Sequence, residues 1–160
     1  MEYILVRVDN RLIHGQILEA WLPFNKATCI IVVDDEVASD FFRETVIKMA
    51  VPREVEVLVF RIDEFARTYA QLDASKKAIV LFSTIESAVK AYNLGFRFES
   101  LNIGNVYSEN FRIRCAASIL LSEKDISDIQ SLTDMGATVE CRCVPKDKPL
   151  DFRDVIKKRK

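Results

Sequence analysis

The chain is poor in the residues on which several common kinds of functional site depend. Its 160 residues include one histidine and four glycines, so a metal site with several histidine ligands is excluded. The nucleotide loops G-x-x-x-x-G-K-[ST] and G-x-G-x-x-G are absent, as is the G-x-S-x-G turn of serine hydrolases. The four cysteines form no C-x-x-C pair, and the spacing of Cys141 and Cys143 is wrong for zinc. We expect these thiols to be buried or half-buried in a reducing compartment.

Long apolar runs and charge of one sign are also missing. No apolar run approaches the ~20 residues that cross a bilayer, and the N-terminus lacks the pattern of a signal peptide. The formal net charge of −1 gives no overall attraction for nucleic acid, and the basic run 157–160 is interpreted as a solvated chain end. Because 49% of the residues are hydrophobic, residues 1–160 are expected to form one domain with its own core. The sequence thus favours a cytoplasmic protein that binds no nucleic acid.

Apolar segments of strand length alternate along the chain with segments of helical periodicity. The expected strands are Tyr3–Val8, Thr28–Val33, Val55–Phe60, Ala78–Phe82 and Ser100–Ile103. The expected helices between them cover residues 15–22, 36–49, 62–72 and 84–94. This alternation predicts right-handed crossovers and an α/β fold, a single open, doubly wound and mainly parallel sheet with helices on both faces.

After residue 103 the pattern changes. A polar loop containing Gly104 leads to a short apolar segment at 111–114, and a helix is expected from Ser122 to Gly136, where a capping box begins it and glycine ends it. The alternating segment Thr138–Val144 is typical of a half-exposed edge strand, which we expect to be antiparallel. A last amphipathic segment, 150–156, is expected to fold back on the body of the protein.

The loop after the first strand carries the most chemistry. In doubly wound folds, ligands bind at the carboxyl ends of the strands, which places loops 9–14, 34–36, 60–62, 83–84 and 104–110 near a site. His14, the lone histidine, lies three residues after Arg11 and directly before Gly15 and Gln16, where a helix begins. The helix N-terminus and Arg11 favour an anion, His14 is a candidate nucleophile, and Asp9 is a candidate to orient it.

On residue pattern alone, this loop predicts an anion site with a candidate nucleophile, and a surface or capping histidine is an equally good interpretation. The acidic segment Asp34-Asp35-Glu36 has two interpretations as well. Its carboxylates are of the type that binds magnesium, but a cap for the second helix is the favoured interpretation.

The segment 7–16, RVDNRLIHGQ, resembles the active-site loop of the IIB component of the mannose/fructose/sorbose family of bacterial sugar phosphotransferase systems. The resemblance continues through most of the chain, in segments 30–38, 81–84, 101–104 and 122–126. It implies that a IIA phosphocarrier domain phosphorylates His14 on Nδ1 and that the group passes to a sugar held by the membrane subunits IIC and IID. It also implies that the protein works in the cytoplasm at the inner face of the membrane, without metal or cofactor.

The resemblance also assigns roles to the neighbours of His14. Arg11 and Asp9 would shape the pocket as catalytic residues, and Arg7, within the strand, is a structural candidate. The residues expected to lie against the phosphoryl group are Gly15, Gln16, Ser83 and Thr84, and by strand geometry also Asn102.

The sequence departs from the family pattern in two places. Asn10 stands where many members have a second acidic residue, and Asn105 and Tyr107 stand where members commonly repeat glycine. Two alternatives stay open beside a transport phosphocarrier: a regulatory module on the same scaffold, or an unrelated binder of small anions or nucleotides. The start at Met1, directly before the first strand, favours a free subunit over one fused to IIA, and a homo-oligomer is compatible with the sequence.

Overall fold

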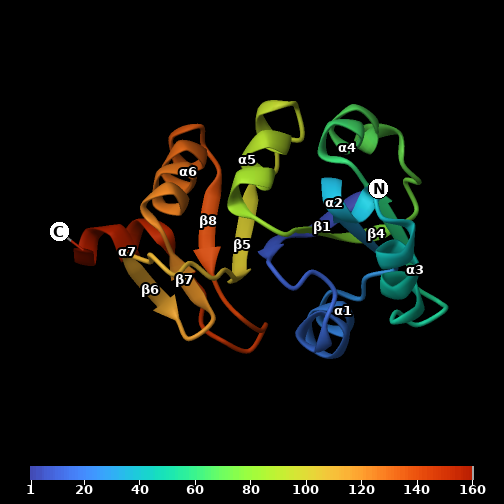
Figure 1. Ribbon diagram of the computed structural model, residues 1–160, viewed down its shortest axis with the longest axis horizontal. Coiled ribbons are helices and arrows are strands. Elements are labelled where there is room, and N and C mark those ends of the chain that lie inside the picture. Colours follow the sequence, from blue (N-terminus) through green and yellow to red (C-terminus); the bar gives the residue numbers. More distant parts are fainter. Residues whose placement is uncertain (160) are drawn as a thin grey trace.

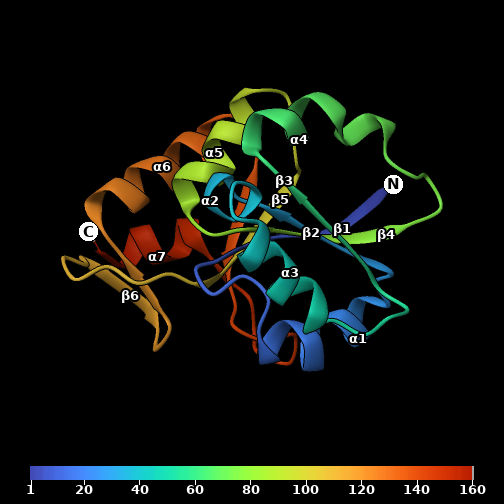
Figure 2. The ribbon, with the colours of Figure 1, turned by 45° about the vertical axis from the view of Figure 1, so that its right-hand side comes forward.

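The computed structural model describes residues 1–159, which form a seven-stranded sheet covered by helices on both faces (Figures 1 and 2). The strands, in the order β3-β2-β4-β1-β5-β8-β9, are β1 (Glu2–Asp9), β2 (Cys29–Val33), β3 (Glu56–Phe60), β4 (Lys77–Phe82), β5 (Ser100–Asn105), β8 (Thr138–Cys141) and β9 (Leu150–Asp151). A separate hairpin joins β6 (Ile113–Ala116) and β7 (Ile119–Leu121). The helices are α1 (Leu22–Asn25), α2 (Asp35–Ala38), α3 (Phe41–Met49), α4 (Ile62–Thr68), α5 (Ile85–Asn93), α6 (Glu123–Asp134) and α7 (Phe152–Arg159), with a π-helical turn η1 (Ile17–Trp21) and a 3₁₀ turn η2 (Tyr69–Gln71).

The mainly parallel α/β fold and the five predicted strands are confirmed. From β3 to β8 every pairing in the sheet is parallel, and only β9 runs antiparallel to its neighbour. All five residues of β2 are buried, because helices cover both faces of the central strands.

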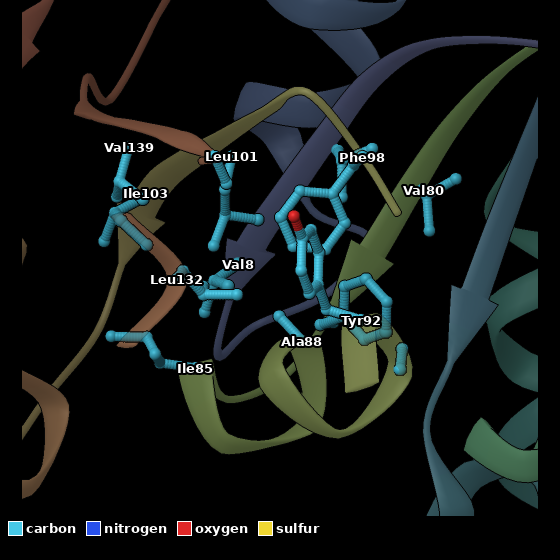
Figure 3. Close-up of a cluster of buried hydrophobic side chains, with 14 of the residues drawn as sticks. Val8, Val80, Ile85, Ala88, Tyr92, Phe98, Leu101, Ile103, Leu132 and Val139 are labelled. Carbon is cyan, nitrogen blue, oxygen red and sulfur yellow. The ribbon is translucent and has the colours of Figure 1, made fainter. Parts of the chain in front are cut away.

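The two faces of the sheet are unlike each other. On one face, α4, α5 and α6 bury a large core that includes side chains from β1, β4, β5 and β8 (Figure 3). On the other face, η1, α1 and α2 close a smaller core over β1, β2, β3 and β4. No residue of β5 or β8 belongs to this second core. On that side, β5 and β8 carry the polar side chains of Asn102 and Glu140, and Trp21 of η1 lies over Arg7 and Arg142 beside them.

The helices differ from the prediction in their details. The segment expected as one helix over 36–49 is divided, because the carboxylate of Asp40 caps the amide of Arg43 and begins α3 as a new helix. The expected helix 62–72 ends as the 3₁₀ turn η2, and the first helix contains the π-helical turn η1. Asp34 caps α2, and Ser122 with Asp125 forms the expected capping box of α6. None of the helices between residues 1 and 159 combines the length and apolar character needed to cross a bilayer.

The C-terminal half contains the other differences. Gly104 lies within β5 rather than in a loop, and β6 and β7 form a hairpin of which only the first segment had a sequence signal. The expected antiparallel edge strand near the C-terminus is present, but its assignment to Thr138–Val144 is wrong, because β8 lies in that segment and pairs in parallel with β5. The two residues of β9 supply the antiparallel edge, and β9 covers the outer side of β8.

The four cysteines are free thiols, buried or half-buried as expected. Burial raises the pKa of Cys29 to about 11. A contact with Cys115, followed by burial, raises the pKa of Cys141. Cys29 and Cys141 are therefore held in the neutral thiol form near pH 7.

Candidate active site

A buried leucine fixes the path of the loop that follows β1. The amide of Leu12 donates to the carbonyl of Asp9 at 2.9 Å, and Leu12 has φ of 56°, a left-handed conformation that side chains disfavour. Such strain costs about 1–3 kcal/mol and persists only where the surroundings impose the conformation. Here the side chain of Leu12, 4% exposed, packs in the smaller core. This packing holds the chain so that His14 returns over the end of β1.

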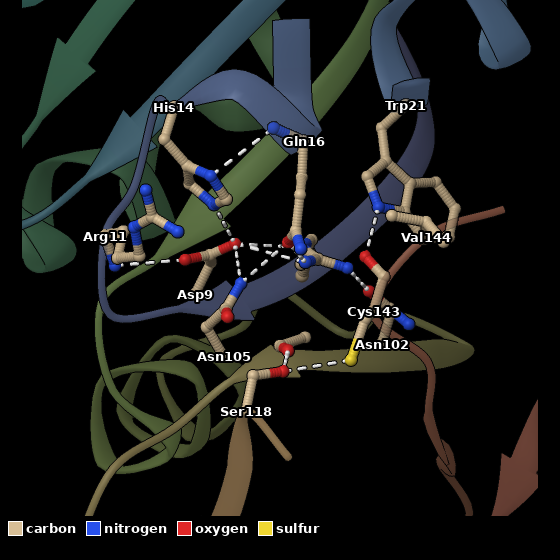
Figure 4. A network of polar contacts seen from close by, with 12 residues as sticks. Asp9, Arg11, His14, Gln16, Trp21, Asn102, Asn105, Ser118, Cys143 and Val144 are labelled. Atoms are coloured by element: carbon tan, nitrogen blue, oxygen red, sulfur yellow. Dashed lines mark hydrogen bonds and ion pairs between the residues drawn. The ribbon is translucent and has the colours of Figure 1, made fainter. Parts of the chain in front are cut away.

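The carboxylate of Asp9 is the centre of a buried polar network (Figure 4). Its Oδ2 accepts from Arg7 Nη2 at 3.1 Å, from His14 Nε2 at 2.7 Å and from Asn105 Nδ2 at 2.9 Å. Its Oδ1 accepts from the backbone amide of Arg11 at 3.0 Å. Asp9 and Arg7 both have side chains that are 0% exposed. A buried carboxylate needs such compensation, and this one is paired with a cation and fully hydrogen-bonded.

The contact with Asp9 determines which nitrogen of His14 is available. An ionised carboxylate can only accept, so in the neutral imidazole the proton is on Nε2 and the lone pair is on Nδ1. The amide of Gln16, within the helical backbone that begins at residue 15, donates a long hydrogen bond of 3.4 Å to Nδ1, which confirms Nδ1 as the acceptor nitrogen. An electrophile with negative oxygens would therefore meet a nucleophilic nitrogen beside backbone donors.

Arg7 joins the site to the interior of the sheet. Its Nη1 donates to Asn102 Oδ1 at 2.6 Å and to the carbonyl of Arg142 at 3.0 Å, and its guanidinium lies 5.2 Å from the centre of the Trp21 ring. Burial lowers the pKa of Arg7, and the charge of Asp9 opposes that shift, so the guanidinium stays protonated. The sequence prediction that Arg7 is structural agrees with this position, in which it neutralises Asp9.

Gly104 leaves the space that Arg7 occupies. A Cβ atom at this position would lie 1.9 Å from Cζ of Arg7 and 2.0 Å from Nη2. No side chain fits at that distance, so β5 must carry glycine opposite the buried guanidinium.

Asn105 closes the network on the side of β5, a position that the sequence did not single out for the site. Its Nδ2 donates to Asp9 Oδ2 and, at 3.1 Å, to Gln16 Oε1. Asn105 is 6% exposed and pairs in register with Asp9. The available signal was its place just after the apolar run of β5, where the carboxyl ends of neighbouring parallel strands meet.

The structure brings together only some of the residues predicted for the site. Asp9, His14 and Gln16 are in contact, whereas the exposed side chain of Arg11 makes no hydrogen bond or ion pair within the described residues 1–159. Gly15 lies beside open space, because a Cβ there would meet nothing within 4 Å.

The other predicted contacts lie further along the sheet. Ser83 donates to Asp34, and Thr84 caps α5 by accepting from the amide of Ser87. Neither hydroxyl bonds to the Asp9 network in the part of the chain that the structure describes. Asn102 contacts Arg7 and Glu140, below the end of β5. A role of Ser83, Thr84 or Asn102 in holding a phosphoryl group stays a prediction.

Comparison with known proteins identifies relatives of this fold and loop. Residues 3–160 match the family model of the PTS system sorbose subfamily IIB component. The chain is 31% identical to the PTS system fructose-specific EIIB component of Bacillus subtilis, over 98% of this chain and 97% of that protein. It is 30% identical to the PTS system mannose-specific EIIAB component of Escherichia coli over 96% of this chain, which spans about half (48%) of that longer protein.

Solved structures give the same result. The IIBSor domain of the sorbose permease from Klebsiella pneumoniae superimposes with a TM-score of 0.88 at 25% identity, covering 100% of this chain and 99% of that one. The structure of manxB from Thermoanaerobacter tengcongensis superimposes with a TM-score of 0.89 at 28% identity, over 98% and 96% of the two chains. The chain therefore belongs to the sorbose-subfamily IIB components of the phosphotransferase system, which are phosphotransferase subunits of sugar transport.

Proposed function

We propose that the protein is a phosphohistidine carrier in which Nδ1 of His14 accepts a phosphoryl group from a IIA domain and passes it to a sugar bound by IIC and IID at the cytoplasmic side of the membrane. The observation that carries this proposal is the 2.7 Å contact between His14 Nε2 and Asp9, which leaves Nδ1 as the nucleophile. The IIA partner is supported by the name of the mannose-specific EIIAB relative, in which the two components share one chain.

The chemistry follows from this arrangement. The lone pair of Nδ1 forms a bond to phosphorus while the N–P bond of the donor phosphohistidine breaks, and the donor imidazole takes back that electron pair. The ring of His14 becomes positively charged because Nε2 keeps its proton, and the carboxylate of Asp9 stabilises this charge. The amide of Gln16, which donates to Nδ1 in the unphosphorylated ring, would turn to a phosphoryl oxygen, and the exposed guanidinium of Arg11 in the same loop would be a second donor. Transfer between two imidazoles is nearly balanced in free energy, so alignment is the main task.

The test is phosphorylation by a phosphorylated IIA domain. We expect one phosphate per chain, labile in acid and stable in base, which mass spectrometry locates on His14. Phosphate on another residue, or no transfer, would contradict the proposal. A second stage adds membranes containing IIC and IID, and phosphorylated sugar is the expected product. Labelled protein that never yields sugar phosphate would favour the regulatory alternative.

Asp9→Asn is expected to slow phosphorylation by about 10³-fold or more, because an amide cannot stabilise the charge that develops on His14. It also leaves the guanidinium of Arg7 buried without its counter-ion, which costs about 3 kcal/mol or more of folding free energy. The rate is therefore measured at a temperature where circular dichroism shows the variant folded. Asp63→Asn, at an exposed position of α4, is the matched control. Equal rates for both variants would remove Asp9 from the mechanism.

Arg11→Ala is expected to slow transfer by about 10²-fold, through the loss of a charge-assisted hydrogen bond to the phosphoryl group. The melting temperature should change little, since Arg11 is exposed and contacts Asp9 through its backbone amide. Arg53→Ala is the control, because this exposed arginine precedes β3 at the opposite end of the sheet. Rapid-quench measurement of phosphate uptake compares the two variants. A wild-type rate for Arg11→Ala would show that this side chain does not reach the phosphoryl group.

A further inference from the structure

Several nitrogen donors share one oxygen of the buried carboxylate of Asp9 (Figure 4). Its Oδ2 lies 3.2 Å from Nε and 3.1 Å from Nη2 of Arg7, 2.9 Å from Nδ2 of Asn105 and 2.7 Å from Nε2 of His14. A carboxylate oxygen has only two lone pairs, so these donors compete for the same negative charge. The strength of the hydrogen bond to His14 therefore depends on how much of that charge the other donors take.

The orientation of the Asn105 amide follows from its neighbours. An ionised carboxylate can only accept, so Nδ2 of Asn105, and not Oδ1, must face Asp9. The same nitrogen donates to Oε1 of Gln16 at 3.1 Å, and Nη2 of Arg7 lies 3.5 Å from that oxygen. A flipped Gln16 would place its own NH₂ group against these two donors. Asn105 therefore directs both of its amide hydrogens into the buried network.

The carboxylate of Asp9 is held in place without Asn105. Two nitrogens of the fully buried Arg7 donate to Oδ2, and the backbone amide of Arg11 donates to Oδ1 at 3.0 Å. These bonds fix both oxygens of the carboxylate. The hydrogen bond from Asn105 therefore acts mainly on the charge of Oδ2 and adds little to its position.

The charge on Oδ2 affects the two states of His14 unequally. In the unphosphorylated ring, Nε2–H is a neutral donor to Asp9. When Nδ1 carries the phosphoryl group and Nε2 keeps its proton, the ring is a cation, and its hydrogen bond to the carboxylate is stronger. A donor that draws charge from Oδ2 weakens the stronger bond by the larger amount, and burial enhances this effect. The amide of Asn105 therefore destabilises phosphorylated His14 relative to the free ring.

We propose that Asn105 is a positioning residue that acts through Asp9: its amide draws charge from Oδ2 and so raises the tendency of phosphorylated His14 to pass its group on. This inference rests on the proposed phosphocarrier function. In that reaction the N–P bond of phosphorylated IIA breaks as the bond from Nδ1 of His14 to phosphorus forms, and the proton on Nε2 stays in place. Asn105 changes the equilibrium of this step and takes no part in the bonds that form and break.

The test is the equilibrium between a phosphorylated IIA domain and the whole protein, measured as the fraction of labelled phosphate on each. Asn105→Leu keeps the branched shape of asparagine but cannot donate. We expect the equilibrium constant for phosphorylation of His14 to rise about fivefold in this variant, because a hydrogen bond to a charged group is lost. Asn93→Leu, at an exposed position of α5, is the control and should keep the wild-type constant. An unchanged or lower constant in folded Asn105→Leu would overturn the proposal.

Asn105→Gly is the second variant, for the case in which circular dichroism shows Asn105→Leu to be unfolded. It removes the same donor without placing an apolar side chain in the network. A water molecule can replace part of the lost hydrogen bond, so the expected rise in the equilibrium constant is about twofold. A constant at or below the wild-type value in this variant would then overturn the proposal.

The effect through Asp9 is also tested without any phosphate. In NMR spectra of the unphosphorylated protein, the Nε2–H proton of His14 should move downfield in the Asn105 variants, because its hydrogen bond to Asp9 becomes stronger. Asn93→Leu should leave this resonance unchanged, and an unchanged resonance in the Asn105 variants would overturn the inference. A wild-type protein that takes up no phosphate would contradict the phosphocarrier function alone, since the NMR measurement needs no IIA domain.

Discussion

His14→Ala is expected to abolish uptake of phosphate from a phosphorylated IIA domain while the protein remains folded. No second imidazole can replace the first, because the chain has one histidine. The fold should survive, since Asp9 keeps its bonds to Arg7, Asn105 and the amide of Arg11 when His14 is removed. The measurement is the stoichiometry of protein-bound phosphate after prolonged incubation, with thermal unfolding followed in parallel.

The control separates loss of the nucleophile from loss of docking. Phosphorylated IIA should still associate with His14→Ala, because the side chain of His14 is only 8% exposed and its removal changes little of the surface. Any phosphate that the His14→Ala variant still carries can be assigned by its stability to acid, because phosphocysteine and phosphoserine differ from phosphohistidine in this property. Acid-labile phosphate on His14→Ala at the wild-type level would refute the assignment of His14.

Gly104→Ala is expected to have the largest effect on stability of any single methyl added to the chain. The added Cβ would lie 1.9 Å from Arg7 Cζ, and the guanidinium has no space to yield, because it is buried between Gly104 and Trp21 and bonded to Asp9 and Asn102. Either the strand shifts or the buried ion pair breaks, at a cost of about 2–5 kcal/mol. Urea denaturation should show a lower midpoint, and phosphorylation should fall with it, because Arg7 positions Asp9.

Gly15→Ala is the matched control for this prediction. A Cβ at Gly15 meets nothing within 4 Å, and the backbone there does not require glycine. We expect an unfolding midpoint close to that of the wild type. Equal stability of the two alanine variants would mean that β5 and Arg7 are less tightly packed than the structure indicates.

The parts of the protein that the sequence predicted well are those determined by short-range patterns. The central strands were recognisable because burial on both faces makes their residues almost uniformly apolar. The contact between Asp9 and His14 could be predicted for a similar reason, since the two residues are only five positions apart, at the end of β1 and in the loop that follows it. The cap that Asp40 provides for α3 is a local signal too. It was missed because the helical periodicity of residues 36–49 continues across the break between α2 and α3.

The parts that escaped prediction depend on contacts between distant segments. Asn102 and Asn105 lie 95 and 96 residues from their partners Arg7 and Asp9, and the carbonyl of Arg142 lies 135 residues from Arg7. No periodicity encodes such pairs, which follow from the crossing of the chain that places β5 beside β1. The direction of β8 escaped for a different reason. Val139 and Cys141 face the larger core while Glu140 lies on the other face among polar side chains, and this alternation resembles that of an edge strand.

The left-handed Leu12 has a consequence for how much of the protein a docking partner would have to order. The backbone of the loop is set by a side chain packed in the core, so the free protein already holds the conformation from which His14 would react. A partner that docks over His14 would then not have to order this loop, and the entropic cost of association would be lower. In the proposed transfer, the same ordered loop would be presented to the donor and then to the acceptor without being rebuilt between the two encounters.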